Sequence, residues 1–117
     1  MEISFYPKRP KAKTETTLFA RISYEGYQIK YYIPEKINPK FWNKETQRAK
    51  ETQRFREHPE FNTRLNNILA DCNNVYRKYV NDKGIIPNPE TFKVLLDKEI
   101  KKKEPEKEKL KNLFWIF

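Results

Sequence analysis

Two runs of alternating hydrophobic and polar residues, at positions 17–24 and 27–33, dominate the first third of the chain. Both runs are rich in β-branched and aromatic residues, and only Glu25 and Gly26 separate them. This arrangement is typical of a β-hairpin whose tight turn uses glycine for a positive φ angle. A shorter run at 3–7 predicts another strand, and Pro7 favours an edge position or the end of that strand.

The two-residue turn predicts which hairpin residues lie opposite one another, because the numbers of paired positions then sum to 51. One face is apolar in both strands, as a face that packs in a core requires. Its pairs are Ile22 with Ile29, Ala20 with Tyr31, and Leu18 with Ile33. The other face is mostly polar, and its pairs are Ser23 with Gln28, Arg21 with Lys30, and Phe19 with Tyr32.

The pair of Arg21 and Lys30 is informative because like charges on neighbouring strands are mildly destabilising. A sheet surface kept only for solubility would more naturally carry opposite charges there. A DNA phosphate or a guanine edge would relieve the repulsion. The alternative is a solvated strand face whose charges splay apart.

The hydrophobic period becomes helical from about Pro59. Apolar residues then recur at steps of three and four, as on a helix that covers a core: Phe61, Leu65, Ile68, Leu69, Cys72, Val75, Tyr76, Tyr79 and Val80. Gly84 suits the C-terminal end of this helix, and Asn88 followed by Pro89 suits the start of a second one. The sequence therefore predicts a long helix over the apolar sheet face, followed by a shorter helix.

The segment between sheet and helix, 35–56, is expected to be a loop that Pro39 and Asn43 keep irregular. Phe41 and Trp42 are expected to fold back as anchors, with Trp42 in the core rather than stacked on a base. Positions 44–56 are strongly polar and carry five basic residues, expected to form a mobile loop that follows phosphates: Lys44, Arg48, Lys50, Arg54 and Arg56.

Charge strengthens the case for a polyanion partner. The net charge is +9, and residues 1–56 hold 13 Lys and Arg against 6 Asp and Glu, whereas residues 57–117 hold 12 against 10. The local peak lies at 8–13, where Lys8, Arg9, Lys11 and Lys13 follow one another closely. Such a peak is the electrostatic footprint of a polyanion site, although an inert basic surface is the alternative.

Several chemistries lack the residues that they need. The chain has one cysteine, one histidine and two glycines, so a structural zinc site, a Cys–His nucleophile and a Gly-rich phosphate loop are not expected. We expect no metal, no cofactor and no small-molecule substrate. Cys72 lies in the helical stripe and is interpreted as a small buried hydrophobe. No run is apolar enough to span a membrane, and no signal peptide is visible.

At 117 residues the chain has room for one small domain and a tail. We expect the domain over 1–100, a charged linker over 101–112 and, in the apolar run 113–117, the start of a truncated second domain. A terminal docking peptide is the alternative for that run.

The order of these elements resembles the arm-type DNA-binding domain at the N-terminus of tyrosine-recombinase integrases, as found in conjugative transposons and prophages. The resemblance covers roughly 1–100 and includes Ile37-x-Pro39-x-x-Trp42-Asn43, Arg48, Leu65-Asn66 and Gly84. It implies an α+β fold, with a three-stranded antiparallel sheet packed against a long helix and a second C-terminal helix. The run 113–117 then resembles the opening of the core-binding domain.

The resemblance also implies that the sheet lies in the major groove of arm-type sites in double-stranded DNA. Carried over by position, the groove-facing residues are Phe19, Arg21, Ser23, Gln28, Lys30 and Tyr32, and Lys8, Arg9, Lys11 and Lys13 flank them on phosphates. Other integrase protomers are further candidate partners. The family's catalytic tyrosine, arginines, histidines and lysine belong to a separate domain, so we expect no catalytic residues here.

Two other functions remain open from the sequence. A protein-interaction module within a recombination complex could use an exposed Phe19 and Tyr32. Single-stranded DNA or RNA could stack on the same two rings. For an integrase arm domain the expected location is the bacterial cytoplasm, in association with the nucleoid.

Overall fold

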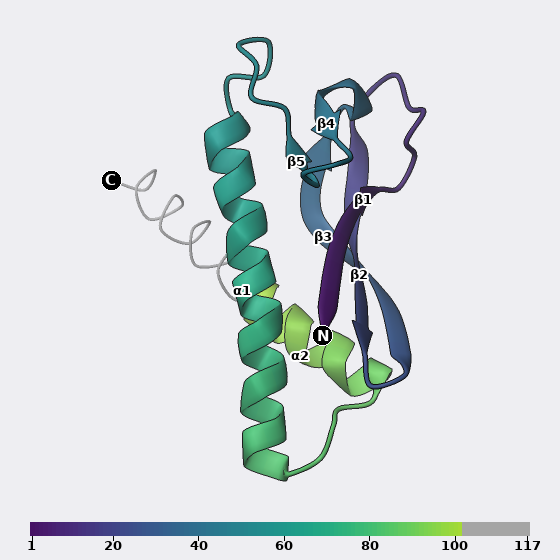
Figure 1. Cartoon of the computed structure of the whole chain (residues 1–117), viewed down its shortest axis with the longest axis vertical. Helices are drawn as coiled ribbons and strands as arrows, with labels where there is room; N and C mark the ends of the chain where they lie inside the picture. The colour runs from purple at the N-terminus through teal and green to yellow at the C-terminus, as the bar shows by residue number, and fades with distance from the viewer. Residues whose placement is uncertain (102–117) are drawn as a thin grey trace, which may run out of the picture. The chain divides into compact units, whose positions relative to one another are not determined.

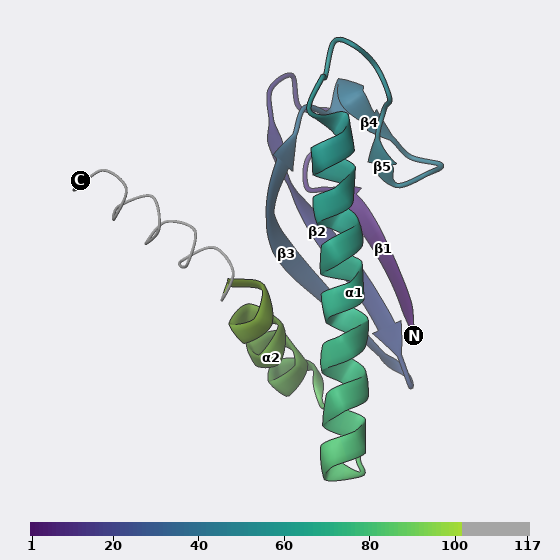
Figure 2. The same cartoon turned by 90° about the vertical axis from the view of Figure 1, so that its left-hand side faces the viewer.

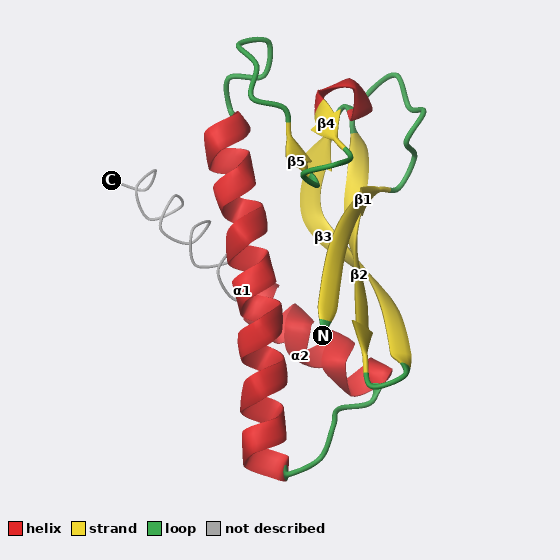
Figure 3. Cartoon of the chain, viewed as in Figure 1, coloured by secondary structure: helices red, strands yellow, loops and turns green. Residues whose placement is uncertain are grey.

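A three-stranded antiparallel sheet is followed by a small hairpin and two helices in this computed structural model, which describes residues 1–101. The sheet has the strand order β1-β2-β3 (Figures 1 and 3). Its strands are β1 (Glu2–Pro7), β2 (Thr16–Tyr24) and β3 (Tyr27–Ile37). The small hairpin is β4 (Trp42–Asn43) and β5 (Arg48–Ala49), and the helices are α1 (His58–Lys83) and α2 (Pro89–Lys101). The expected α+β fold is confirmed.

The chain divides into two compact units, and the boundary falls inside α1. The first unit, Met1–Leu69, contains the sheet, the small hairpin and the first part of α1. The second unit begins at Ala70 and contains the rest of α1 together with α2. Most of the predicted linker and the whole of the run 113–117 lie outside the described residues.

The hairpin register next to the turn is as predicted. Every pair from Ser23 with Gln28 to Phe19 with Tyr32 is present. Glu25 and Gly26 have φ angles of 42° and 83°. Two positive values in succession are what a tight turn between twisted antiparallel strands requires.

Farther from the turn, the predicted pair of Leu18 with Ile33 is wrong. The register shifts between Phe19 and Thr17, so that Thr17 lies opposite Lys36. Pro34 falls in the shifted stretch, and a proline has no N–H to donate to the ladder, so a bulge on this edge strand accommodates it. The strand therefore continues past its expected end, although the side chains of Leu18 and Ile33 are still buried.

The core of the first unit lies on the inner face of the sheet. Its buried sheet residues are Phe5, Leu18, Ala20, Ile22, Ile29, Tyr31 and Ile33. The first part of α1 runs along this face (Figure 2) and contributes the buried residues Phe61, Leu65 and Ile68. Burying apolar area in this way is the main favourable contribution to folding. It confirms both the predicted apolar face and the helical stripe within this unit.

The expected loop at 35–56 contains more regular structure than Pro39, Asn43 and its many polar residues suggested. Pro39 begins a 3-10 helix, with Asn38 as its N-cap. Asn43 lies in β4, and its Oδ1 accepts hydrogen bonds from the backbone N–H groups of Glu45 and Thr46, at 2.9 and 3.3 Å. A short polar side chain can thus hold a turn instead of ending all regular structure. Trp42 is 5% exposed, which confirms its core role.

The helix ends in the second unit follow the predicted signals. Gly84 has a φ of 69° and follows the last residue of α1, where a left-handed residue is common. The Oδ1 of Asn88 accepts a 2.8 Å hydrogen bond from the N–H of Thr91, as an N-cap side chain does. Pro89 is the first residue of α2. The rings of Tyr76 in α1 and Phe92 in α2 stack, with their centroids 5.9 Å apart.

Candidate nucleic-acid interface

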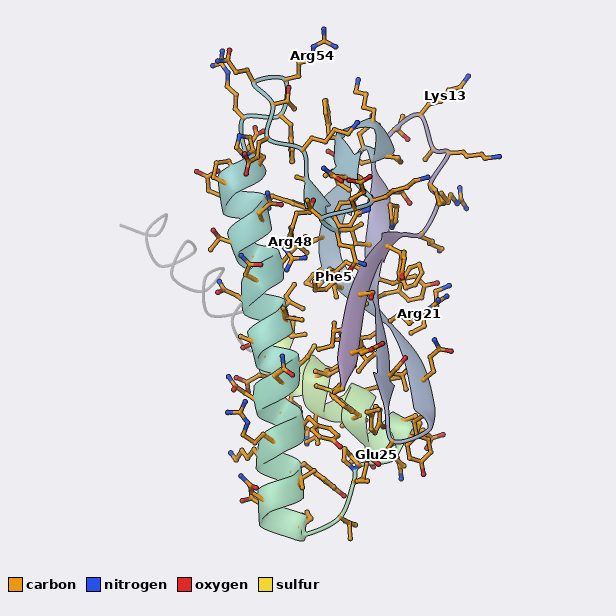
Figure 4. All side chains as sticks on the ribbon, viewed as in Figure 1. Phe5, Lys13, Arg21, Glu25, Arg48 and Arg54 are labelled. Atoms are coloured by element: carbon orange, nitrogen blue, oxygen red, sulfur yellow. The ribbon has the colours of Figure 1, made fainter. Side chains whose placement is uncertain are left out.

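The outer face of the sheet carries the predicted hairpin residues. We call outer face the surface formed by Ser4, Tyr6, Phe19, Arg21, Ser23, Gln28, Lys30 and Tyr32, whose side chains alternate along the strands with those of the core. Figure 4 shows Arg21 on one side of the sheet and Phe5 on the other. The six predicted groove-facing residues therefore share one surface.

An aromatic row crosses all three strands of the outer face. Tyr6, Phe19 and Tyr32 are cross-strand neighbours. The Phe19 ring centroid lies 5.7 Å from that of Tyr6 and 5.9 Å from that of Tyr32. Phe19 is only 9% exposed, so the expectation of an exposed Phe19 is wrong. The rings of Tyr6 and Tyr32 and the side chain of Lys30 cover the Phe19 ring, which is therefore largely shielded from solvent.

A cationic row lies beside the aromatic row. Arg21 on β2 and Lys30 on β3 are directly opposite, as predicted. The uncharged Ser4 lies opposite Arg21 on β1. Neither cation forms an ion pair with a carboxylate among the described residues. Both lie over aromatic rings instead: Cζ of Arg21 is 5.2 Å from the Tyr6 centroid, and Nζ of Lys30 is 4.4 Å from the Phe19 centroid.

These ring contacts explain how two like charges can be neighbours. A cation over an aromatic face gains about 0.5–1 kcal/mol at an exposed site, which is comparable to the cost of a like-charge cross-strand pair. The rings stabilise the cations without neutralising them. Among residues 1–101, no carboxylate therefore neutralises the positive charges of Arg21 and Lys30 on the outer face.

The basic loop between β1 and β2 is held at both ends. The N–H of Lys8 donates to the carbonyl of Thr17 at 2.8 Å, and the N–H of Arg9 donates to Oγ1 of Thr16 at 3.2 Å. At the far side of the loop, Nδ2 of Asn38 donates to the carbonyl of Lys13 at 3.2 Å. The basic side chains themselves are exposed, and Figure 4 shows Lys13 at the end of the sheet away from the turn at Glu25.

The amino-acid sequence that forms this basic surface was compared with models of known protein families. Residues 3–93 match the family model described as Arm DNA-binding domain. The chain belongs to this family. Arm DNA-binding domains are found in tyrosine recombinases and integrases, and they are non-catalytic. Searches of curated proteins and of solved structures found no match.

Arg48 of the arm domain has a role that its sequence position did not indicate. Its Nε and Nη2 donate to Oδ1 of Asn66 at 3.0 and 2.8 Å, and its Cζ lies 5.2 Å from the centroid of Phe5. Partial burial lowers the pKa of the guanidinium. Arg48 thus ties the small hairpin to α1, whereas the sequence suggested that it follows phosphates.

Tyr6 of the arm domain lies on the outer face, although it was not among the residues predicted for that face. Alternation within β1 places Phe5 and Tyr6 on opposite faces, and this signal was visible. The pairing of β1 with β2 was not, because the long loop between them leaves the register open, unlike a two-residue turn. Only the folded sheet sets Tyr6 beside Phe19.

The remaining chemistry of the arm domain is sparse. Cys72 is fully buried, and desolvation together with the charge of Asp71 raises the pKa of its thiol to about 12. Over residues 1–101, no group of three or more His, Cys, Asp and Glu side chains could hold a metal ion. Within the same residues, neither α1 nor α2 has the length and hydropathy of a membrane-spanning segment.

Proposed function

We propose that this arm domain binds arm-type sites in double-stranded DNA by placing the outer face in the major groove. In this way it would serve integrase-mediated site-specific recombination. The observation that carries the proposal is the pair of Arg21 and Lys30, which are neighbours without carboxylate partners among the described residues. A surface of this kind is stabilised by an anionic partner.

The residue types of the outer face suit base edges. The major groove is about 12 Å wide and admits a strand pair. Arg21 and Lys30 can donate to O6 and N7 of guanine, and Gln28 can make the two hydrogen bonds that adenine offers. Ser23 can donate or accept.

The basic loop suits the DNA backbone. Its cations are exposed and lie on a loop whose backbone is fixed near both ends. Lys8, Arg9, Lys11 and Lys13 would neutralise phosphates next to the groove. Contacts of this kind position a protein on DNA without reading its sequence.

We further propose that the parent protein is a tyrosine recombinase of a mobile element. It would act in the bacterial cytoplasm, in association with the nucleoid and with other protomers of the same integrase. The arm domain would supply DNA binding, and a separate domain would supply cleavage and rejoining.

The two alternative functions lose part of their basis. A protein-binding surface and a base-stacking platform were both expected to use exposed Phe19 and Tyr32. With Phe19 at 9% exposure, one of the two rings is unavailable to either partner. The free positive charge beside them favours duplex DNA over a protein partner.

The test is a titration of the chain with labelled duplex DNA and with single strands of the same sequence, at two salt concentrations. We expect tighter binding of the duplex and an affinity that falls steeply with salt, because phosphate contacts release counterions. Backbone amide signals of 19–32 should shift in NMR spectra. An affinity that does not depend on salt, or unchanged hairpin signals, would contradict the proposal.

A further inference from the structure

The aromatic row of the outer face contains two exposed tyrosine rings, one on each side of the covered ring of Phe19. Tyr6 is 36% and Tyr32 is 47% exposed, whereas Phe19 between them is 9% exposed. Exposed tyrosine rings on a polar sheet face add apolar area that solubility does not require. A partner that buries these two rings would gain the free energy of removing their apolar surface from water.

The surroundings of these rings leave little room for a stacked base. Tyr6 has Phe19 as its ring neighbour at 5.7 Å and Arg21 over its ring at 5.2 Å. Tyr32 has Phe19 at 5.9 Å, and Nζ of Lys8 and of Lys30 each lie 5.4 Å from its centroid. Each exposed ring therefore already has an aromatic neighbour and at least one cation. A small apolar group fits this setting better than the plane of a base.

The major groove displays one such group among the four common bases, the 5-methyl group of thymine. Next to this methyl group lies O4 of thymine, which accepts hydrogen bonds. A ring with a cation beside it matches this combination, because the ring can contact the methyl group while the cation donates to the oxygen. Tyr6 with Arg21 and Tyr32 with Lys30 are two such combinations.

We propose that Tyr6 and Tyr32 contact thymine methyl groups and so make thymine a determinant of the recognised site. The inference rests on the proposed function, since it requires the outer face to lie in the major groove. It adds that the face reads thymine through apolar contact, in addition to any hydrogen bonds from its cations.

The test uses a duplex selected by the full chain from a random-sequence pool. Each thymine of that duplex is replaced in turn by deoxyuridine, which lacks only the methyl group. At one or more positions we expect binding to weaken about fourfold, the effect of one buried methyl-sized group. No protein variant is needed for this part, so folding of a variant does not affect the result.

Variants then assign the contact to a ring. In Tyr32→Ser or Tyr6→Ser, the difference between the thymine and uracil duplexes should vanish at one of the sensitive positions. In Tyr32→Phe, which keeps the ring, the difference should remain. The matched control is Tyr27→Ser: Tyr27 is 44% exposed and belongs to the same strand, but it alternates to the opposite face. Thermal unfolding of each variant checks its fold.

The outcomes separate the two proposals. If the selected duplex binds equally well with every thymine replaced by uracil, the thymine inference is overturned and duplex binding stands. A difference that survives both serine variants would also overturn it. If no duplex binds at all, the proposed function itself fails.

Discussion

Arg48 in β5 and Asn66 in α1 share two hydrogen bonds to one oxygen: Nε and Nη2 of the arginine lie 3.0 and 2.8 Å from Oδ1 of the asparagine. One helical turn earlier, Oδ1 of Asn62 accepts from the N–H of Ala49 at 2.8 Å, and its Nδ2 donates to the carbonyl of Ala49 at 3.3 Å. Successive turns of α1 therefore hold the small hairpin through side-chain amides.

This relationship predicts that Arg48 contributes to stability. Replacement by lysine removes the planar fork that reaches Asn66, because an ammonium group is a point donor. We expect Arg48→Lys and Asn66→Ala each to lower the free energy of unfolding by about 1 kcal/mol. The double variant should lose less than the sum of the two single losses. Urea unfolding measures all three.

The control is Lys50→Ala, which removes a nearby exposed cation whose ammonium group has no hydrogen-bond or ion-pair partner among residues 1–101. Its stability should change by less than about 0.5 kcal/mol. Additive losses in the double variant would show that the two hydrogen bonds do not couple Arg48 to Asn66.

Arg21 and Lys11 should affect DNA binding in different ways. Arg21→Ala should cost about 1–3 kcal/mol on the preferred duplex and little on unrelated sequences, because the proposed contact is to a base edge. Lys11→Ala should weaken all duplexes alike and reduce the salt slope of log K by about 0.9. Fluorescence anisotropy with a selected and a scrambled duplex, at several salt concentrations, measures both effects. Equal losses on the two duplexes for Arg21→Ala would argue against base reading.

The turn of the hairpin predicts a stabilising change. Glu25 has a φ of 42°, a left-handed conformation that asparagine adopts more readily than glutamate. We expect Glu25→Asn to raise the free energy of unfolding by about 0.5 kcal/mol and Gly26→Ala to lower it by about 1 kcal/mol. Glu45→Asn is the matched control, because Glu45 is also an exposed turn residue but has no positive φ. Equal effects of the two asparagine variants in urea unfolding would refute the conformational explanation.

Cys72 should be unreactive in the folded protein. Burial raises the pKa of its thiol from 9.0 to about 12, and the thiolate is the form that attacks thiol reagents. At pH 8 we expect an aromatic disulfide reagent to label Cys72 much more slowly in native protein than in urea. Rapid labelling of folded protein would contradict the buried position.

The same pKa shift has a consequence for stability. A raised pKa in the folded state means that the thiol stabilises the fold fully below pH 9 and progressively less as the pH rises towards 12. The loss of stability above pH 9 should therefore be shallower in Cys72→Ala than in the wild-type chain. Urea unfolding at pH 8, 9 and 10 compares the two slopes.

Local signals predicted much of the fold. The turn at Glu25 and Gly26 defined the register as far as Phe19 opposite Tyr32, because each next pair depends only on the one before it. The bulge at Pro34 broke this series, since counting from the turn cannot show where a missing N–H displaces the ladder. The helix ends at Gly84 and Asn88 were predictable for the same local reason: a cap depends on residues within one turn.

The sequence by itself determined the hairpin, its pair of like charges, the helical stripe and the excess of positive charge, which all follow from short-range periodicity and composition. Only the tertiary structure decided that Tyr6 joins the outer face, that Phe19 is covered and that Arg48 binds Asn66. The physical reason is the length of the connections. The long loop between β1 and β2 leaves the register of that strand pair open. The polar segment 44–56 likewise contains no local signal that Arg48 will bind Asn66 of α1.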